Sequence, residues 1–161
     1  MLSDLGELPV LDLAALARDA VRENAARALA AGVDLGWQGD EQVMVRGQRL
    51  LLREALANLI DNAILYAGRG AEVTVQVHLA GDGFAELLVD DDGPGIAATQ
   101  MPHLFQRFWR GSELPGGCGL GLAIVQEVAQ RHGGEAFAQA REPRGLCVGL
   151  RLQAVPATDS R

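Results

Sequence analysis

The order of the hydrophobic patterns along the chain limits the folds that it can adopt. Three segments have apolar residues at helical spacing, at 13–30, at 48–67 and in the stretch that follows the glycine-rich run 116–122. Seven short segments predict strands, at 9–12, 33–37, 42–46, 72–79, 84–89, 135–140 and 146–152. Tight turns join the fourth to the fifth and the sixth to the seventh as antiparallel hairpins, and the second and third could also pair. Because hairpins stand in place of regular strand–helix–strand units, the pattern predicts an α+β fold, a two-layer sandwich, instead of a doubly wound sheet.

Composition excludes several classes of function. The chain contains no lysine, and all 14 of its basic residues are arginines. A P-loop and a eukaryotic-type protein kinase both need a lysine at the phosphates, so this chain belongs to neither class. The net charge of −7 argues against a general nucleic-acid binder. Cys118 and Cys147 lie far apart without metal-ligand spacing, which argues against a zinc site or a disulfide framework and fits a reducing cytosol.

Length and hydrophobic content predict one domain. The 161 residues, of which 48% are hydrophobic, are enough for a single core. We expect this domain to span 1–155, with 1–9 as the end of a preceding linker and a disordered tail at 156–161. The sequence shows no apolar run long enough to cross a bilayer and no leader peptide, so we expect a cytoplasmic segment without direct membrane contact.

A polar stripe runs along the helix predicted at 48–67. Glu54, Asn58 and Asn62 are spaced four apart and so share one side, with Tyr66 at the end of the stripe and the core leucines opposite. Asparagine is a poor residue inside a helix, so two of them need a reason. An amide carbonyl can be a hard oxygen ligand for Mg²⁺, whereas on the helix alone a solvated face is the simpler interpretation.

Three consecutive aspartates, 90–92, follow the strand predicted at 84–89 and precede Gly93, Pro94, Gly95 and Ile96. The glycines formally fit a dinucleotide fingerprint, but Pro94 and the missing strand–helix–strand unit make that match weak. An EF-hand is excluded because its twelfth position would be Met101. What remains is a carboxylate at a strand end, beside glycines that let a flat ligand approach the backbone. Such a carboxylate can accept a hydrogen bond from the exocyclic amine of adenine.

The glycine-rich run 116–122 leads directly into a helical pattern. Glycines that open a helix expose backbone N–H groups and the positive end of the helix dipole to an anion, commonly a phosphate. Without a lysine, this cradle has to depend on backbone groups, a metal ion and arginines.

Four segments, in this order and spacing, resemble the motifs of one family. Residues 58–63 resemble the N box, 91–95 the first glycine box, 104–110 the F box and 117–122 the second glycine box of bacterial sensor histidine kinases. The resemblance covers nearly the whole chain and implies the ATP-binding catalytic domain of these kinases. It also implies the Bergerat fold of the GHKL superfamily, a mixed and mostly antiparallel sheet backed by helices on one face, with ATP under a short lid.

The resemblance assigns roles residue by residue. Asn62 would be the Mg²⁺ ligand, Asp91 would bind the adenine amino group, and Asn58, Asn62 and Arg110 would form the catalytic set. Phe105 and Phe108 would anchor the lid, and Arg107 is a weaker candidate than Arg110 for a phosphate contact. The implied ATP-binding residues are Asn58, Asn62, Tyr66, Asp91, Gly93, Gly95, Ile96, Phe108, Gly117, Gly119, Leu120, Gly121 and Leu122.

The implied activity is transfer of the ATP γ-phosphate to a histidine on a dimerisation domain, for signalling to a response regulator. His78, His103 and His132 all lack the context of the family's acceptor histidine, so we expect the acceptor to lie outside this chain, in a longer and homodimeric kinase. ATP-hydrolysing relatives carry a glutamate where this chain has Asn58, which favours transfer over hydrolysis. Two alternatives remain, a serine kinase of the anti-sigma type and a non-catalytic nucleotide switch. Leu65 and Cys118 keep the second open, because relatives often have a basic residue and a hydroxyl there.

Overall fold

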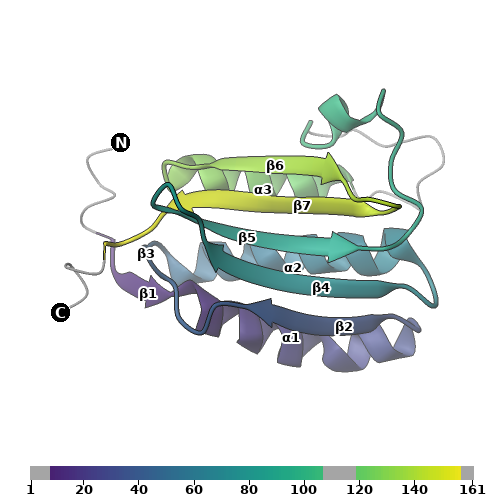
Figure 1. Cartoon of the computed structure of the whole chain (residues 1–161), viewed down its shortest axis with the longest axis horizontal. Coiled ribbons are helices and arrows are strands. Elements are labelled where there is room, and N and C mark those ends of the chain that lie inside the picture. Colours follow the sequence, from purple (N-terminus) through teal and green to yellow (C-terminus); the bar gives the residue numbers. More distant parts are fainter. Residues whose placement is uncertain (1–7, 107–118, 157–161) are drawn as a thin grey trace.

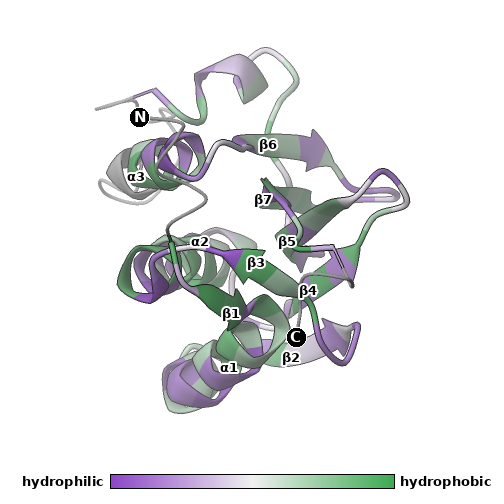
Figure 2. Ribbon diagram, turned by 90° about the vertical axis from the view of Figure 1, so that its left-hand side faces the viewer, coloured by the Kyte–Doolittle hydropathy of each residue, from purple (hydrophilic) through white to green (hydrophobic). Residues whose placement is uncertain are grey.

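The computed structural model describes residues 8–106 and 119–156, which form a sheet with helices on one face. The helices are α1 (Leu13–Ala30), α2 (Arg49–Ala67) and α3 (Gly119–Arg131), and all three pack on the same side of the sheet (Figures 1 and 2). None of the helices in these ranges is both long and apolar enough to cross a membrane. The predicted two-layer α+β architecture is confirmed.

The main sheet has five strands in the order β2-β4-β5-β7-β6. Their bounds are β2 Asp34–Gly39, β4 Glu72–Leu79, β5 Phe84–Asp91, β6 Glu135–Ala140 and β7 Leu146–Gln153. Strands β2 and β4 pair in parallel, and every other pair in this sheet is antiparallel. Both predicted hairpins, β4–β5 and β6–β7, are therefore confirmed, as is the mixed and mostly antiparallel sheet.

The second and third strands, which could have paired with each other, do not do so. Strand β3 (Met44–Arg46) pairs instead with β1 (Val10–Asp12) in a separate two-stranded sheet. Asp12 explains this arrangement, because its carboxylate caps α1 by accepting the Ala14 N–H and also accepts the Val43 N–H, both at 3.0 Å. One side chain thus ties the start of the helix to the segment that enters β3. Strand β2 is left to extend the main sheet beside β4.

Alternation along the strands places the core between the sheet and the helices. In β4, Val73, Val75 and Val77 are fully buried, while the residues between them lie on the opposite face and are partly exposed. Helix α2 covers this core with Leu52, Leu56 and other residues of its apolar side. The central position of α2 brings its polar stripe close to the end of β5 and the start of β7.

His132 connects the end of α3 to the start of α2. Its ring is 4% exposed, its Nδ1 donates to the Val128 carbonyl oxygen at 2.8 Å, and its Nε2 accepts the Gln48 N–H at 3.0 Å. A side chain at Gly47 would approach the same ring to 2.9 Å, so glycine makes room for this contact. The histidine therefore has a structural role, because it joins the two helices that flank the candidate site.

Replacing His132 by phenylalanine should destabilise the fold while keeping the ring's bulk. The Gln48 N–H loses its partner, and the Val128 carbonyl keeps only the backbone N–H of residue 132, so the free energy of unfolding should fall by about 1–3 kcal/mol. Urea denaturation measures this change. The control is Arg131→Gln, which removes an exposed ion pair with Glu127 and should cost less than about 1 kcal/mol. Equal stability of His132→Phe and the wild type would contradict the assignment.

Candidate nucleotide-binding site

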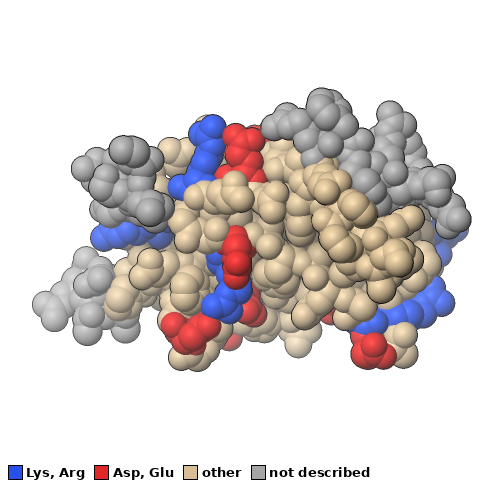
Figure 3. Space-filling view, turned by 90° about the horizontal axis from the view of Figure 1, so that it is seen from above, with Lys and Arg blue, Asp and Glu red and all other residues tan. Residues whose placement is uncertain are grey.

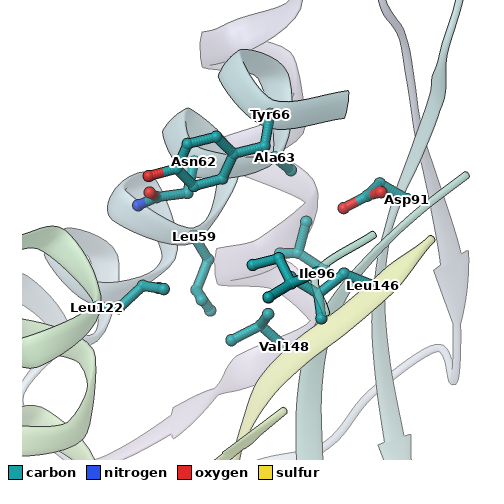
Figure 4. Close-up of a pocket in the computed structure, with 10 residues that line it drawn as sticks. Leu59, Asn62, Ala63, Tyr66, Asp91, Ile96, Leu122, Leu146 and Val148 are labelled. Atoms are coloured by element: carbon teal, nitrogen blue, oxygen red, sulfur yellow. The ribbon is translucent and has the colours of Figure 1, made fainter. Parts of the chain in front are cut away.

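A cavity opens between α2, the end of β5, the start of β7 and the start of α3 (Figure 4). It holds about 330 Å³ of empty space, part of it open to solvent. Most of its wall is apolar, and the polar side chains are contributed by α2 and β5. The lining residues are Leu59, Asn62, Ala63, Tyr66, Val89, Asp91, Ile96, Leu122, Leu146 and Val148. An apolar slot with a few convergent polar groups is the usual form of a small-molecule site.

Asp91 is the acidic group of this cavity. It is the last residue of β5, it is 6% exposed, and its Oδ1 accepts the Gly93 N–H at 2.9 Å. Burial raises the pKa of the Asp91 carboxyl above its ordinary value, although hydrogen bonds from the Gly93 and Leu146 backbone act in the opposite direction. The two neighbouring aspartates bind groups outside the cavity: Asp90 forms an ion pair with Arg141, and Asp92 accepts the Glu72 N–H.

Glycines bring the backbone close around Asp91. A Cβ at Gly93 would lie 2.5 Å from the Cα of Ala67, and Gly95 has a φ of 78° beside the Gly145 carbonyl. A Cβ at Gly145 would overlap the backbone carbonyl oxygen of Asp91 itself. Gly145 was not among the predicted site residues, because nothing in the pattern of its hairpin turn indicates that it lies against residue 91. The loop after β5 is thus packed between the end of α2 and the β6–β7 turn.

Asn62 supplies a second buried polar group. It is 8% exposed, and its Nδ2 donates to the Asn58 carbonyl oxygen at 2.7 Å, one helical turn earlier. Its Oδ1 is buried and has no hydrogen-bond partner among the residues that the structure describes. Leaving a buried carbonyl unsatisfied costs free energy, so a missing ligand is a natural partner. The solvated-face interpretation holds for the exposed Glu54 and is wrong for Asn62.

The Oδ1 atom of Asn62 is a chemically suitable ligand for Mg²⁺. In the described part of the chain, no three His, Cys, Asp or Glu side chains gather in a way that could hold a metal ion. A hard cation bound here would therefore need an amide oxygen, water and the oxygens of its own ligand. That donor set suits Mg²⁺, which keeps several waters and shares phosphate oxygens.

The other predicted site residues fall into three groups. Tyr66, Ile96 and Leu122 line the cavity, and Gly93 and Gly95 form the loop beside it. Asn58 is half-buried one turn before Asn62 and is not a lining residue, while Gly119, Leu120 and Gly121 form the first turn of α3. Phe105 packs against the core. The predictions that lie outside the described residues are Arg107, Phe108, Arg110, Gly117 and Cys118.

Five lining residues were not among the predicted site residues. Leu59 and Ala63 belong to the helical pattern of α2, and Val89, Leu146 and Val148 belong to strands, so all five had the periodicity of core positions. Periodicity identifies a face that avoids water, but it cannot separate a residue that packs on protein from one that would pack on a ligand.

Residues 47–156 match the family described as histidine kinase-, DNA gyrase B-, and HSP90-like ATPase. The chain belongs to this family. Sensor protein SphS of Synechococcus elongatus is 39% identical over 149 residues, which cover 85% of this chain and 35% of SphS. Sensor-like histidine kinase SenX3 of Mycobacterium tuberculosis is 34% identical, over 90% of this chain and 36% of SenX3. This ATPase-family chain thus spans about a third of the length of these sensor proteins.

Solved structures agree with the family assignment. The mycobacterial sensor histidine kinase MprB superposes with a TM-score of 0.81 at 28% identity, covering 92% of this chain and 99% of that one. The ATP-binding domain of PrrB from Mycobacterium tuberculosis superposes at 0.74 and 28% identity, covering 91% of this chain and 97% of that domain. This ATPase-family chain therefore has the fold of the ATP-binding catalytic domain of sensor histidine kinases.

Substituting Asp91 by asparagine should stabilise the nucleotide-free protein at neutral pH. The pKa of Asp91 is higher in the folded than in the unfolded protein, so ionisation of its carboxyl lowers the free energy of unfolding. The loss begins as the pH rises above the ordinary aspartate pKa and is complete above the folded pKa. The asparagine avoids this charge, and its amide oxygen can still accept the Gly93 N–H. Urea denaturation should show a gain at pH 7 that disappears at pH 3.

The neighbouring substitution Asp92→Asn provides the control for that experiment. Asp92 is less buried than Asp91, and its carboxylate accepts the Glu72 N–H at 2.8 Å. It should therefore show no comparable gain at pH 7. A loss of stability in Asp91→Asn that persists at both pH values would contradict the cost assigned to the buried charge.

Proposed function

We propose that this domain binds ATP with Mg²⁺ and transfers the γ-phosphoryl group to a histidine on a dimerisation domain outside the chain. From there the phosphoryl group would pass to a response regulator. One observation carries the proposal: a buried carboxylate and an unpartnered amide oxygen line the same apolar cavity, beside the start of a helix. The sensor-kinase relatives favour a histidine acceptor over a serine kinase of the anti-sigma type.

Asp91 would recognise the base. Its carboxylate can accept the exocyclic amine of adenine, and the apolar wall formed by Ile96, Leu146 and Val148 suits the faces of a flat ring. Because the Gly93 N–H donates to the carboxylate and Gly145 packs against the Asp91 backbone, adenine would meet an acceptor that is already oriented. Guanine has a carbonyl where adenine has its amine, so it would face the carboxylate with an acceptor.

Asn62 and the start of α3 would receive the phosphates. The bond from Asn62 Nδ2 to the Asn58 carbonyl orients the amide so that Oδ1 is available to Mg²⁺, which would neutralise charge on the phosphate oxygens when bound. The first N–H groups of α3 have no partners within the helix and can donate to phosphate. Asn58 would border the phosphates, and Arg110 would add positive charge to them.

The reaction needs positioning more than covalent chemistry from the protein. A neutral imidazole nitrogen attacks the γ-phosphorus, the bond to the bridging oxygen breaks, and ADP leaves with that electron pair. The attacking nitrogen uses its own lone pair, so the domain needs no strong base. Asn58 stands one turn before the metal ligand and is a poor base for activating water, which favours transfer over hydrolysis. We infer a cytoplasmic location and a homodimeric full-length kinase on the same grounds of family resemblance.

Mixing the domain with its own acceptor domain and labelled ATP tests the proposed reaction. We expect phosphate on the acceptor that is stable to base and labile to acid, as a phosphorylated nitrogen is. The acceptor with its histidine replaced by glutamine is the control and should remain unlabelled. Nucleotide binding without transfer would instead indicate a switch module, a possibility connected with the exposed Leu65 at a position where relatives carry a cation.

Substitutions at Asn62 and Asp91 should distinguish the contribution of the phosphate end of the ligand to affinity from that of the base. Asn62→Ala should abolish the Mg²⁺-dependent part of ADP affinity, by about tenfold or more, and leave the affinity in EDTA unchanged. Asp91→Asn should weaken binding in both conditions, because it changes the base contact. Calorimetry measures all four affinities.

Asn24 offers a matched control for the Asn62 experiment. Like Asn62, it lies in a helix and donates from Nδ2 to the carbonyl four residues earlier, at 2.8 Å, but it is on α1. Asn24→Ala should bind ADP as the wild type does, with and without Mg²⁺. Full retention of the Mg²⁺ effect in Asn62→Ala would refute the assignment of the metal ligand.

A further inference from the structure

A second hollow lies behind the loop that follows β5. It is lined by the α2–β4 turn, the end of β5 and the β6–β7 turn, which meet at one end of the sheet (Figure 1). It encloses about 790 Å³, including the part open to solvent. Its lining residues are Ala67, Arg69, Gly70, Ala71, Asp92, Arg141, Pro143 and Arg144. None of these lines the nucleotide cavity, and Ala67 of the hollow packs closely against Gly93 in the loop after β5.

Three arginines and one aspartate line this hollow, in a chain whose net charge is −7. Elsewhere, most arginines that the structure describes are neutralised by carboxylates. The ion pairs are Arg22–Asp19, Arg27–Asp61, Arg53–Glu23, Arg131–Glu127 and Arg151–Asp82. Figure 3 shows the same mixture over one face, where basic and acidic side chains lie in small groups. In the hollow, by contrast, three arginines lie close together and only Arg141 is in an ion pair with a carboxylate among the described residues.

The three arginines differ in how they are held. Arg69 has no hydrogen bond or ion pair with any other described residue, and its guanidinium lies over Gly32, where a Cβ would approach Nη1 to 2.7 Å. Arg141 pairs through Nε with Asp90 at 3.2 Å. Arg144 donates from Nε to the carbonyl oxygens of Asp92 and Gly93, both at 3.1 Å. The terminal nitrogens of Arg144 are thus available to a ligand, while its Nε is anchored to the protein.

This set of donors matches an oxyanion. A guanidinium presents a planar fork of N–H groups that fits phosphate and carboxylate in bidentate fashion, and several forks around one space fit a molecule with more than one acidic group. The apolar residues of the lining are small, so the hollow offers little wall for a hydrophobic ligand. We propose that it binds a small oxyanion with two or more phosphate or carboxylate groups.

We further propose that Arg144 transmits this binding to the nucleotide cavity. Its Nε holds the carbonyls of Asp92 and Gly93, and the Gly93 N–H in turn holds the Asp91 carboxylate. An anion that orders the Arg144 side chain therefore also orders the loop that positions Asp91. By linkage, ligands in the two sites should strengthen each other's binding. This second part depends on the proposed adenine contact of Asp91, whereas the anion site itself does not.

Titration of the nucleotide-free protein with inorganic pyrophosphate, and separately with citrate, tests the anion site. The Nε–H resonances of Arg69, Arg141 and Arg144 should shift with at least one of the two probes, and the tighter probe identifies phosphate or carboxylate as the preferred group. Arg69→Gln should weaken that affinity by about tenfold, because one charge-assisted contact is lost. Arg22→Gln removes an equal charge from the exposed surface of α1 and should leave the affinity within about twofold of the wild type.

Arg69→Gln should fold normally, since the described structure gives its guanidinium no partner to lose. An unchanged amide spectrum checks this. The proposal is overturned if neither probe binds, or if Arg69→Gln and Arg22→Gln bind equally well, which would place the anion elsewhere, for example at the start of α3. Arg144→Gln gives a second check, and it should also weaken anion binding.

Adenosine, which has no phosphates to compete for the anion site, tests the transmission. Its affinity, followed by the amide resonances of Gly93 and Gly95, should rise about twofold or more when the better probe is saturating. The gain should be absent in Arg144→Gln. If the affinity for adenosine is the same with and without the anion, the proposed role of Arg144 in transmission is wrong and the anion site still stands. If adenosine does not bind in any condition, the adenine role of Asp91 is wrong.

Discussion

The burial of the Asp91 carboxylate is the constraint on which the surrounding structure depends. A charge at the end of a central strand is unfavourable unless backbone N–H groups compensate it, and those groups must come very close. The loop after β5 therefore folds back so that Gly93 can donate to Asp91 while it touches α2 at Ala67. Gly145 lies against the Asp91 backbone from the other side. No side chain fits in either place, so one buried charge accounts for glycines in two distant segments.

The amide of Asn62, like the carboxylate of Asp91, is a buried polar group that only partly bonds to the protein. Its Nδ2 is satisfied within α2, its Oδ1 is not satisfied by any described residue, and it lines the same cavity as Asp91. Each group has part of its bonding capacity held by the protein and part directed toward the cavity. Such incomplete satisfaction is costly in a folded core, and it is expected where a ligand completes the bonds. The scaffold provides rigidity, since His132 joins the two helices that border the site.

Much of the fold was predictable because its elements have strong local patterns. Helix α1 begins and ends where its periodicity predicted, at Leu13 and Ala30, and both hairpins were identified from short turns between alternating strands. The possible pairing of β2 with β3 does not occur. Sequence neighbours often pair, but the Asp12 carboxylate binds the segment before β3 and holds it against β1. A hydrogen bond between residues 31 positions apart leaves no mark in a local pattern.

The sequence by itself determined the element order and the absence of any lysine-dependent phosphate loop. The resemblance of its motifs to those of sensor histidine kinases predicted Asn62 and Asp91 as polar groups of the site. Element order and composition are read from neighbouring residues and residue types. Only the tertiary structure decided that Asp91, and not Asp90 or Asp92, is buried in the cavity, that Gly145 supports it, and that three arginines converge behind it. These depend on close approach between distant segments, which packing decides and local pattern does not record.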